Sequence, residues 1–239
     1  MAQQLHHKAQ FILDYVPDDV KVSIIGYSIS CYLLLDLLKT ENLKIRTVAD
    51  TVDTKSKNID TLYLIFPTIE RMKHTPLGKF ILPALVYFTW FILLLAGFLS
   101  MFPTVIKFPV IKRILTSSEG KPPQDQFITG AIQMIHPAML KRVLNTLQEE
   151  LEKVNELDLR TIEKNREKVV FYYGSYDPLC PKYFLYELKD KLPEVQAYLC
   201  QDELHHVYVT HTSAQMARIM KKIMGEQEKK AIQTTQSTN

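Results

Sequence analysis

The sequence predicts an α/β fold in which a parallel sheet is flanked by helices, and two observations support this prediction. Short runs rich in β-branched and aromatic residues alternate along the chain with longer stretches of helical periodicity. The three clearest runs each end at a glycine or a proline, as strands that lead into a turn do. Because strands separated by helices pair in parallel, we expect helices on both faces of the sheet.

The elements follow one another in a regular order. We expect strands at residues 21–25 (KVSII), 61–66 (TLYLIF) and 168–173 (KVVFYY), and a weaker strand at residues 196–200. We expect helices at residues 4–15, 31–39, 138–157, 183–192 and 213–224. The helix at 138–157 is predicted to be a solvated cap helix, with a short partner-binding coiled coil as the weaker alternative. The polar residues 225–239 predict a disordered tail.

Composition excludes several classes of protein. The 239 residues are 46% hydrophobic, which suits one globular domain or a domain carrying an insertion. The net charge of +3 comes from 29 basic and 26 acidic residues without a basic stripe, so dedicated nucleic-acid binding is not expected. The start of the sequence does not have the pattern of a signal peptide.

Cysteines and histidines give no sign of a metal centre or another cofactor. The three cysteines, Cys31, Cys180 and Cys200, form no C-x-x-C pair, which favours a reducing compartment over a disulfide scaffold. The tandem histidines at 6–7 and 205–206 do not have the spacing of a zinc-hydrolase helix. Seven glycines in all leave no glycine-rich loop for phosphate binding.

Residues 80–106 form an uncharged run of 27 residues, of which 21 are apolar. About 20 such residues suffice to cross the hydrocarbon core of a membrane as a helix. Basic residues lie on both flanks, at Lys79 and from Lys107 onward, and Pro83, Gly97 and Pro103 are expected to bend or break the helix. We therefore predict a bent element in contact with a membrane or lipid surface. A buried helix pair under a lid is the alternative.

A serine follows the first predicted strand in the pattern that a nucleophile elbow requires. Gly26-Tyr27-Ser28-Ile29-Ser30 lies between a strand and a helix, where the glycine permits a tight turn and Ser28 projects from the sheet edge. The amide of Ile29 then lies at the helix N-terminus, where it can stabilise an oxyanion. The usual motif ends in glycine, and Ser30 departs from it.

An acid and a histidine follow later strands. A serine hydroxyl needs a histidine to take its proton, and a carboxylate must orient that histidine. Asp177 comes just after residues 168–173, and His206 comes just after residues 196–200. The order Ser28, Asp177, His206 is that of α/β-hydrolases. Asp177 could instead only initiate a turn, and His205 or His211 could serve in place of His206.

Several strings resemble one family. Phe66-Pro67-Thr68-Ile69-Glu70-Arg71-Met72 follows a strand, and the chain also contains Phe171-Tyr172-Tyr173-Gly174, Asp177-Pro178 and Cys180-Pro181-Lys182. Together they resemble the lipid droplet-associated hydrolases, which are serine hydrolases of the α/β-hydrolase superfamily. The resemblance covers the helix at residue 4 through the helix near Met224. It implies that Ser28 is the nucleophile, Asp177 the acid and His206 the base, and that no cofactor is needed.

The resemblance also implies location and domain organisation. It implies residence on lipid droplets and the endoplasmic reticulum membrane, hydrolysis of neutral lipid esters, and a lipid-embedding insert that contains residues 80–106. The expected division is a first core part at 1–72 with the elbow, a helical insert at 73–160, a second core part at 161–224, and the tail at 225–239.

The sequence departs from the family pattern in three ways. Proteins of this family carry a further N-terminal part of the sheet, with a loop that supplies a second oxyanion amide, and the sequence begins just before the elbow strand. The family motif reads G-H-S-x-G, so Tyr27 and Ser30 both differ. The polar stretch at 47–60 is longer than the usual link.

Three hypotheses follow. The chain is expected to be a serine esterase of lipid surfaces; a catalytically weak or inactive droplet-associated remnant with a targeting or structural role is the alternative. A third hypothesis is a soluble hydrolase in which residues 80–106 cover an apolar substrate pocket.

Overall fold

The computed structural model describes the chain except for residues 18–19, 40–58, 117–121, 203 and 238–239. The described residues divide into two compact units. One contains Met1–Ala96 and Pro137–His206, and the other contains Gly97–His136 and Val207–Asn239. The expected stretch at 47–60 lies almost wholly outside the described residues.

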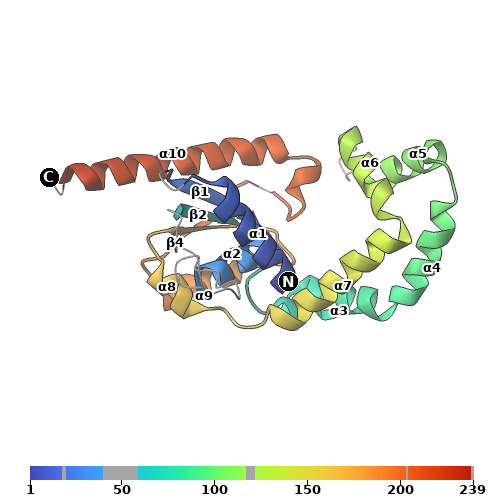
Figure 1. Cartoon of the computed structure of the whole chain (residues 1–239), viewed down its shortest axis with the longest axis horizontal. Coiled ribbons are helices and arrows are strands. Elements are labelled where there is room, and N and C mark those ends of the chain that lie inside the picture. Colours follow the sequence, from blue (N-terminus) through green and yellow to red (C-terminus); the bar gives the residue numbers. More distant parts are fainter. Residues whose placement is uncertain (18–19, 40–58, 117–121, 203, 238–239) are drawn as a thin grey trace. The chain divides into compact units, whose positions relative to one another are not determined.

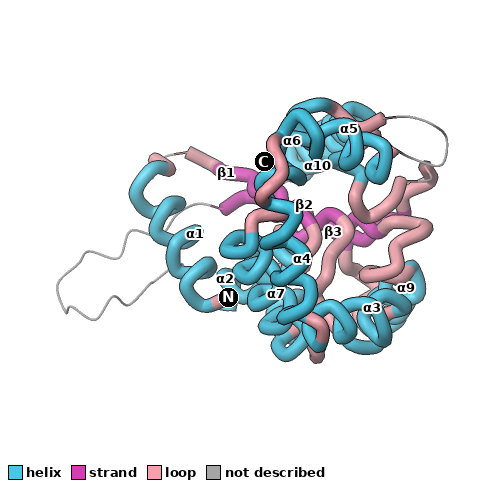
Figure 2. The backbone as a smooth tube through the Cα atoms, turned by 90° about the vertical axis from the view of Figure 1, so that its right-hand side faces the viewer, coloured by secondary structure: helices cyan, strands magenta, loops and turns pink. Residues whose placement is uncertain are grey.

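The first unit is built on a parallel sheet of four strands in the order β1-β2-β3-β4. Figure 2 shows strands β1, β2 and β3 in magenta. The strands are β1 (Val22–Tyr27), β2 (Ile59–Ile65), β3 (Val169–Tyr173) and β4 (Gln196–Leu199). Every neighbouring pair is parallel, and Tyr27 is paired with Ile65, Ile65 with Tyr172, and Tyr173 with Leu199. The carboxyl ends of all four strands therefore meet at one edge of the sheet, which is where open α/β sheets bind ligands.

Helices pack on this sheet through one continuous apolar core. They are α1 (Ala2–Tyr15), α2 (Ile29–Lys39), α8 (Leu159–Lys164) and α9 (Lys182–Lys191), which surround the strands in Figure 1. Alternate residues of the strands enter the core, including Leu62 and Leu64 of β2 and Phe171 and Tyr173 of β3. The five residues of β3 are all buried, as expected of an interior strand of a parallel sheet.

A run of helices joins β2 to β3. It comprises the short 3₁₀ turn η2 (Met72–His74) and the helices α3 (Pro76–Tyr87), α4 (Thr89–Ser100), α5 (Thr104–Leu115), α6 (Asp125–Met134) and α7 (Pro137–Lys153). Thr75 caps α3 by accepting a hydrogen bond from the Gly78 amide at 3.0 Å, and Pro76 occupies the first helical position. Leu82 of α3 and Leu151 of α7 share a second core with Leu33 of α2. This packing joins α3 and α7 to the unit that contains the sheet.

The uncharged run is bent, but the break is not where the sequence predicts it. Among the described residues, no single helix is both long and apolar enough to cross a membrane, whereas α3 and α4 taken together satisfy both criteria across a bend of 67°. The break lies at Phe88, while Pro83 and Gly97 lie inside α3 and α4. Pro83 has no N–H group and so removes one backbone hydrogen bond from the interior of α3. Packing of α3 against its neighbours can compensate for this loss. Pro103 does mark a break, as the residue before α5.

The C-terminal prediction is wrong for most of its length. Helix α10 (Ser213–Ser237) extends well past Met224, through residues expected to be disordered, and follows the 3₁₀ turn η3 (Tyr208–Thr210). Glutamate, glutamine, lysine and alanine dominate residues 226–233, and all four have high helix propensity. The polar composition of these residues argues against a buried core, but it is compatible with a helix.

We expect Phe171→Ala to lower the free energy of unfolding by about 3 to 5 kcal/mol, because it leaves a cavity in the middle of the sheet core. Phe171 is 0% exposed, whereas Phe80 of α3 is 76% exposed and provides a matched control. Phe80→Ala should change the free energy of unfolding by less than about 0.5 kcal/mol. Urea denaturation of both variants checks the prediction, and equal losses would contradict this assignment of the core.

Candidate active site

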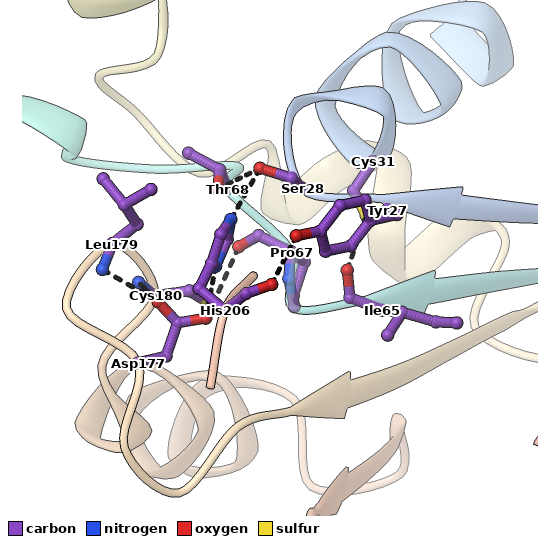
Figure 3. Close-up of polar contacts among 10 residues, drawn as sticks. All are labelled: Tyr27, Ser28, Cys31, Ile65, Pro67, Thr68, Asp177, Leu179, Cys180 and His206. Atoms are coloured by element: carbon purple, nitrogen blue, oxygen red, sulfur yellow. Dashed lines mark hydrogen bonds and ion pairs between the residues drawn. The ribbon is translucent and has the colours of Figure 1, made fainter. Parts of the chain in front are cut away.

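Ser28 lies at a sharp turn between β1 and α2 (Figure 3). Its φ angle is +55°, a left-handed conformation that is rare for residues other than glycine. The turn is held by the backbone, because the Ser28 amide donates to the Ile65 carbonyl at 3.0 Å and the Ser28 carbonyl accepts from the Cys31 amide at 3.0 Å. At Gly26 a β-carbon would lie 2.7 Å from Leu34 Cδ1 and 3.4 Å from the Cys31 backbone, so a larger residue would crowd the turn. This is the geometry of a nucleophile elbow.

Asp177 and His206 lie beside this serine. His206 Nε2 is 2.8 Å from Ser28 Oγ, and His206 Nδ1 is 2.6 Å from Asp177 Oδ2. The other oxygen of Asp177 accepts hydrogen bonds from the Leu179 and Cys180 amides at 2.8 and 3.0 Å. Asp177 and His206 are 5% and 7% exposed. A continuous chain of hydrogen bonds thus links a buried carboxylate, an imidazole and a hydroxyl.

The structure places the alternative candidate residues in different surroundings. Asp177 does shape a turn, through the Leu179 and Cys180 amides, and it contacts His206 with its second oxygen. His205 is exposed, and His211 Nδ1 contacts Thr210 Oγ1 at 2.6 Å. Of the three candidate histidines, His206 is the one whose ring bridges Asp177 and Ser28.

Three residues of the site were not identified from the sequence. The Tyr27 hydroxyl donates a hydrogen bond to the His206 carbonyl, and the two rings lie 5.5 Å apart. The ring of Phe66 stacks on the same imidazole at 6.1 Å. Thr68 is buried, and its Oγ1 is 3.4 Å from Ser28 Oγ. Tyr27 directly precedes Ser28, and Thr68 follows β2. Their positions at the ends of strands are the sequence feature from which they could have been predicted to belong to the site.

The nearby cysteines do not compete with the serine as nucleophiles. Burial raises the pKa of the Cys180 thiol well above its usual value, and the Asp177 carboxylate raises it further. Burial likewise raises the pKa of Cys31. Both side chains therefore remain protonated thiols near neutral pH, and a thiol is a much weaker nucleophile than a thiolate. Cys180 and Cys31 donate hydrogen bonds to the Pro67 and Ile65 carbonyls, which indicates a structural role.

The amide of Ile29 is placed to bind an anion. Ile29 is the first residue of α2, and the first N–H groups of a helix have no partner within the helix. The helix dipole adds a partial positive charge at the same end. An oxygen atom that carries negative charge can be stabilised there. Among the described residues, no group of three or more His, Cys, Asp and Glu side chains could hold a metal ion.

Comparison with known proteins places the chain in a family. The family model described as lipid-droplet associated hydrolase matches residues 1–209. The chain belongs to this family. It is 30% identical over 219 residues to the lipid droplet-associated hydrolase of Gallus gallus, covering 91% of this chain and 62% of that protein. For the Homo sapiens protein the identity is 31%, covering 90% of this chain and 61% of that protein. The chain thus spans about three fifths of the length of these relatives.

Solved structures show the same fold at low sequence identity. A meta-cleavage product hydrolase superposes with a TM-score of 0.54 at 11% identity, covering 94% of this chain and 72% of that one. A serine hydrolase involved in carbazole degradation gives a TM-score of 0.53 at 14% identity, covering 93% and 70%. The fold of this lipid droplet-associated hydrolase family member is therefore that of the α/β-hydrolases, as the sequence predicted.

We expect Gly174→Ala to lower the free energy of unfolding by about 1 to 3 kcal/mol. A β-carbon at Gly174 would lie 2.8 Å from the ring of Phe66, which itself stacks on His206 and has a φ angle of +48°. The matched control is Gly130→Ala in α6, where a β-carbon meets nothing within 4 Å and helix propensity should raise stability by about 0.5 to 1 kcal/mol. Urea denaturation measures both, and a loss of stability at Gly130 but not at Gly174 would contradict the expectation.

Proposed function

We propose that the chain is a serine hydrolase in which Ser28, His206 and Asp177 form the catalytic triad. The observation that supports this proposal is the hydrogen-bonded chain from Asp177 through His206 to Ser28, with links of 2.6 and 2.8 Å. Ser28 Oγ attacks an ester carbonyl while His206 Nε2 takes its proton, and Asp177 holds the imidazole in the required tautomer. His206 then protonates the departing alcohol, and water releases the acid from the acyl-enzyme.

We assign stabilisation of the oxyanion in this reaction to the backbone N–H of Ile29. It follows the nucleophile directly and lies at the N-terminus of α2, which is the position of one oxyanion donor in α/β-hydrolases. The left-handed backbone of Ser28 supports this assignment, because it turns the chain so that strand and helix meet at the hydroxyl. No metal or organic cofactor is required for acyl transfer by this route.

The substrate class is proposed from the surface and the family name. The relatives are named lipid droplet-associated hydrolases, and α3 and α4 expose large apolar side chains. Phe80, Tyr87 and Trp90 are each at least two-thirds exposed. Exposed apolar patches of this kind mark contact with membranes or other apolar partners. We therefore propose a lipid ester as the substrate, and lipid droplets and the endoplasmic reticulum membrane as the surfaces on which the protein acts.

A fluorophosphonate probe tests the proposed activity, because it reports an activated serine whatever the substrate. We expect the chain to be labelled and Ser28→Ala to abolish the labelling. Ser23→Ala, which removes an exposed serine from the same strand, is the matched control and should be labelled at the original rate. Asp177→Asn should slow labelling by about 1000-fold to 10,000-fold, as expected when the histidine loses its orienting carboxylate.

Folded protein that takes up no probe would refute the triad proposal and support a non-catalytic, droplet-associated role. Labelling that persists in Ser28→Ala would mean that another nucleophile reacts. If Asp177→Asn were labelled at the original rate, Asp177 would only shape its turn. Circular dichroism of each variant establishes that it is folded before labelling is compared.

A further inference from the structure

The helical run after β2 has an unusual charge distribution. Residues 72–116 contain five lysines and arginines and none of the 26 acidic residues of the chain. The rest of the chain then holds 24 basic and 26 acidic residues, so its net charge is slightly negative. The positive charge of the whole chain therefore arises from this one segment, in which all charged side chains have the same sign.

Several of these basic residues adjoin strongly exposed apolar side chains of the segment. Lys73 is exposed in η2 and Lys79 is exposed in the first turn of α3, and Phe80 directly follows Lys79 with 76% of its surface exposed. On α5, Lys107 follows Val105 and Ile106, which are 83% and 53% exposed. Lys112 lies 5.8 Å above the Phe108 ring and 3.5 Å from Asp125. Positive charge and exposed apolar surface thus occur together on both helices.

We propose that residues 72–116 bind a lipid surface that carries anionic phospholipid headgroups, an inference that rests on the proposed action at lipid surfaces. Apolar side chains such as Phe80 and Trp90 enter the acyl region. Lysine stems lie along the apolar surface while their ammonium groups reach the phosphates. An aspartate or glutamate in the segment would be repelled by the same headgroups, and the segment contains none.

Charge complementarity distinguishes this proposal from simple apolar anchoring. Apolar insertion accounts for the lack of any charge at residues 80–106, but it does not favour one sign of charge in the flanks, where residues 72–79 and 107–116 hold five basic and no acidic side chains. A negative lipid surface attracts each nearby lysine or arginine enough to tighten binding about fivefold, and salt weakens this attraction. The headgroup charge, and not only the apolar interior, is therefore what the segment recognises.

Flotation of the full chain with vesicles tests the proposal. We compare vesicles of phosphatidylcholine alone with vesicles of phosphatidylcholine and phosphatidylserine, at low and high salt. We expect tighter binding to the anionic vesicles, and weaker binding as salt rises. Lys73→Gln with Lys79→Gln should weaken anionic binding by about fivefold for each lysine. The matched control is Lys189→Gln with Lys191→Gln, which removes the same charge from exposed positions of α9.

Equal binding to both vesicle types, or equal losses in the two double variants, would overturn the proposed headgroup recognition. Binding to neither vesicle type would overturn both this inference and the proposed action at lipid surfaces. The same samples are labelled with fluorophosphonate in solution, so failure of the proposed catalytic function is recognised separately. Phe80→Ala should weaken binding to both vesicle types while leaving the preference for anionic lipid unchanged.

A second inference concerns Tyr27. Its hydroxyl donates to the backbone carbonyl of His206, and its ring lies 5.5 Å from the imidazole at an angle of 34°. Tyr27 is also the residue directly before Ser28, so one side chain ties the nucleophile strand to the loop that bears the histidine. We infer that Tyr27 is a positioning residue that holds His206 within reach of Ser28, which again rests on the proposed triad.

Labelling kinetics separate this role from simple packing. We expect Tyr27→Phe, which keeps the ring, to lower the maximal rate of fluorophosphonate labelling by about 2-fold to 12-fold while the half-saturating probe concentration stays the same. Tyr176→Phe is the matched control, because Tyr176 is 60% exposed and adjoins Asp177. An unchanged maximal rate in Tyr27→Phe would overturn the inference, as would an equal fall in Tyr176→Phe. Complete loss of labelling in Ser28→Ala together with slow labelling in Asp177→Asn supports the triad proposal independently of Tyr27.

Discussion

The parallel pairing of β1 with β2 is the constraint on which the site depends. It places Tyr27 opposite Ile65, so the next amide, that of Ser28, donates to the Ile65 carbonyl and ends the strand at that point. The same alignment continues through β3 and β4, which brings the loops with Asp177 and His206 to one edge. A slip of one residue in β1 would turn the serine to the opposite face of the sheet.

The strands and the order of the site residues could be predicted from the sequence because both are local signals. A β-branched run ending at Gly26 indicates a strand and its turn, and Asp177 and His206 each follow a strand closely. The choice of His206 over His205 came from the family resemblance and not from a local pattern, because neighbouring residues at a strand end differ only in the direction of their side chains. The conformation of the loop sets that direction. The hydrogen bond from the Tyr27 hydroxyl to the His206 carbonyl joins residues that are 179 positions apart in the sequence. No local pattern records such a contact.

The helical run shows where composition misleads. Hydropathy predicted a single bent element at residues 80–106, with its bends at proline and glycine. The structure has a break at Pro103, as expected, but a second break lies at Phe88 while Pro83 stays inside α3, where Leu82 packs in the second core. Leu82 anchors α3 against α7 and α2, and the exposed residues lie on the remaining surface. In α10 composition misleads in the opposite direction, because the polar residues predict disorder although their helix propensity is high.

Backbone strain links the fold to the chemistry. Ser28 and Phe66 both have positive φ angles, and they lie at the ends of adjacent paired strands. Each is held by a backbone hydrogen bond to the next strand: the Ser28 amide bonds to Ile65 at 3.0 Å, and the Phe66 amide bonds to Tyr172 at 2.8 Å. Conformations of this kind cost about 1 to 3 kcal/mol each and persist only where the surroundings enforce them. Here the sheet enforces both, and the result is that the hydroxyl of Ser28 and the ring of Phe66 approach His206 from two strands. The stability of the parallel sheet therefore keeps the site assembled before any substrate arrives.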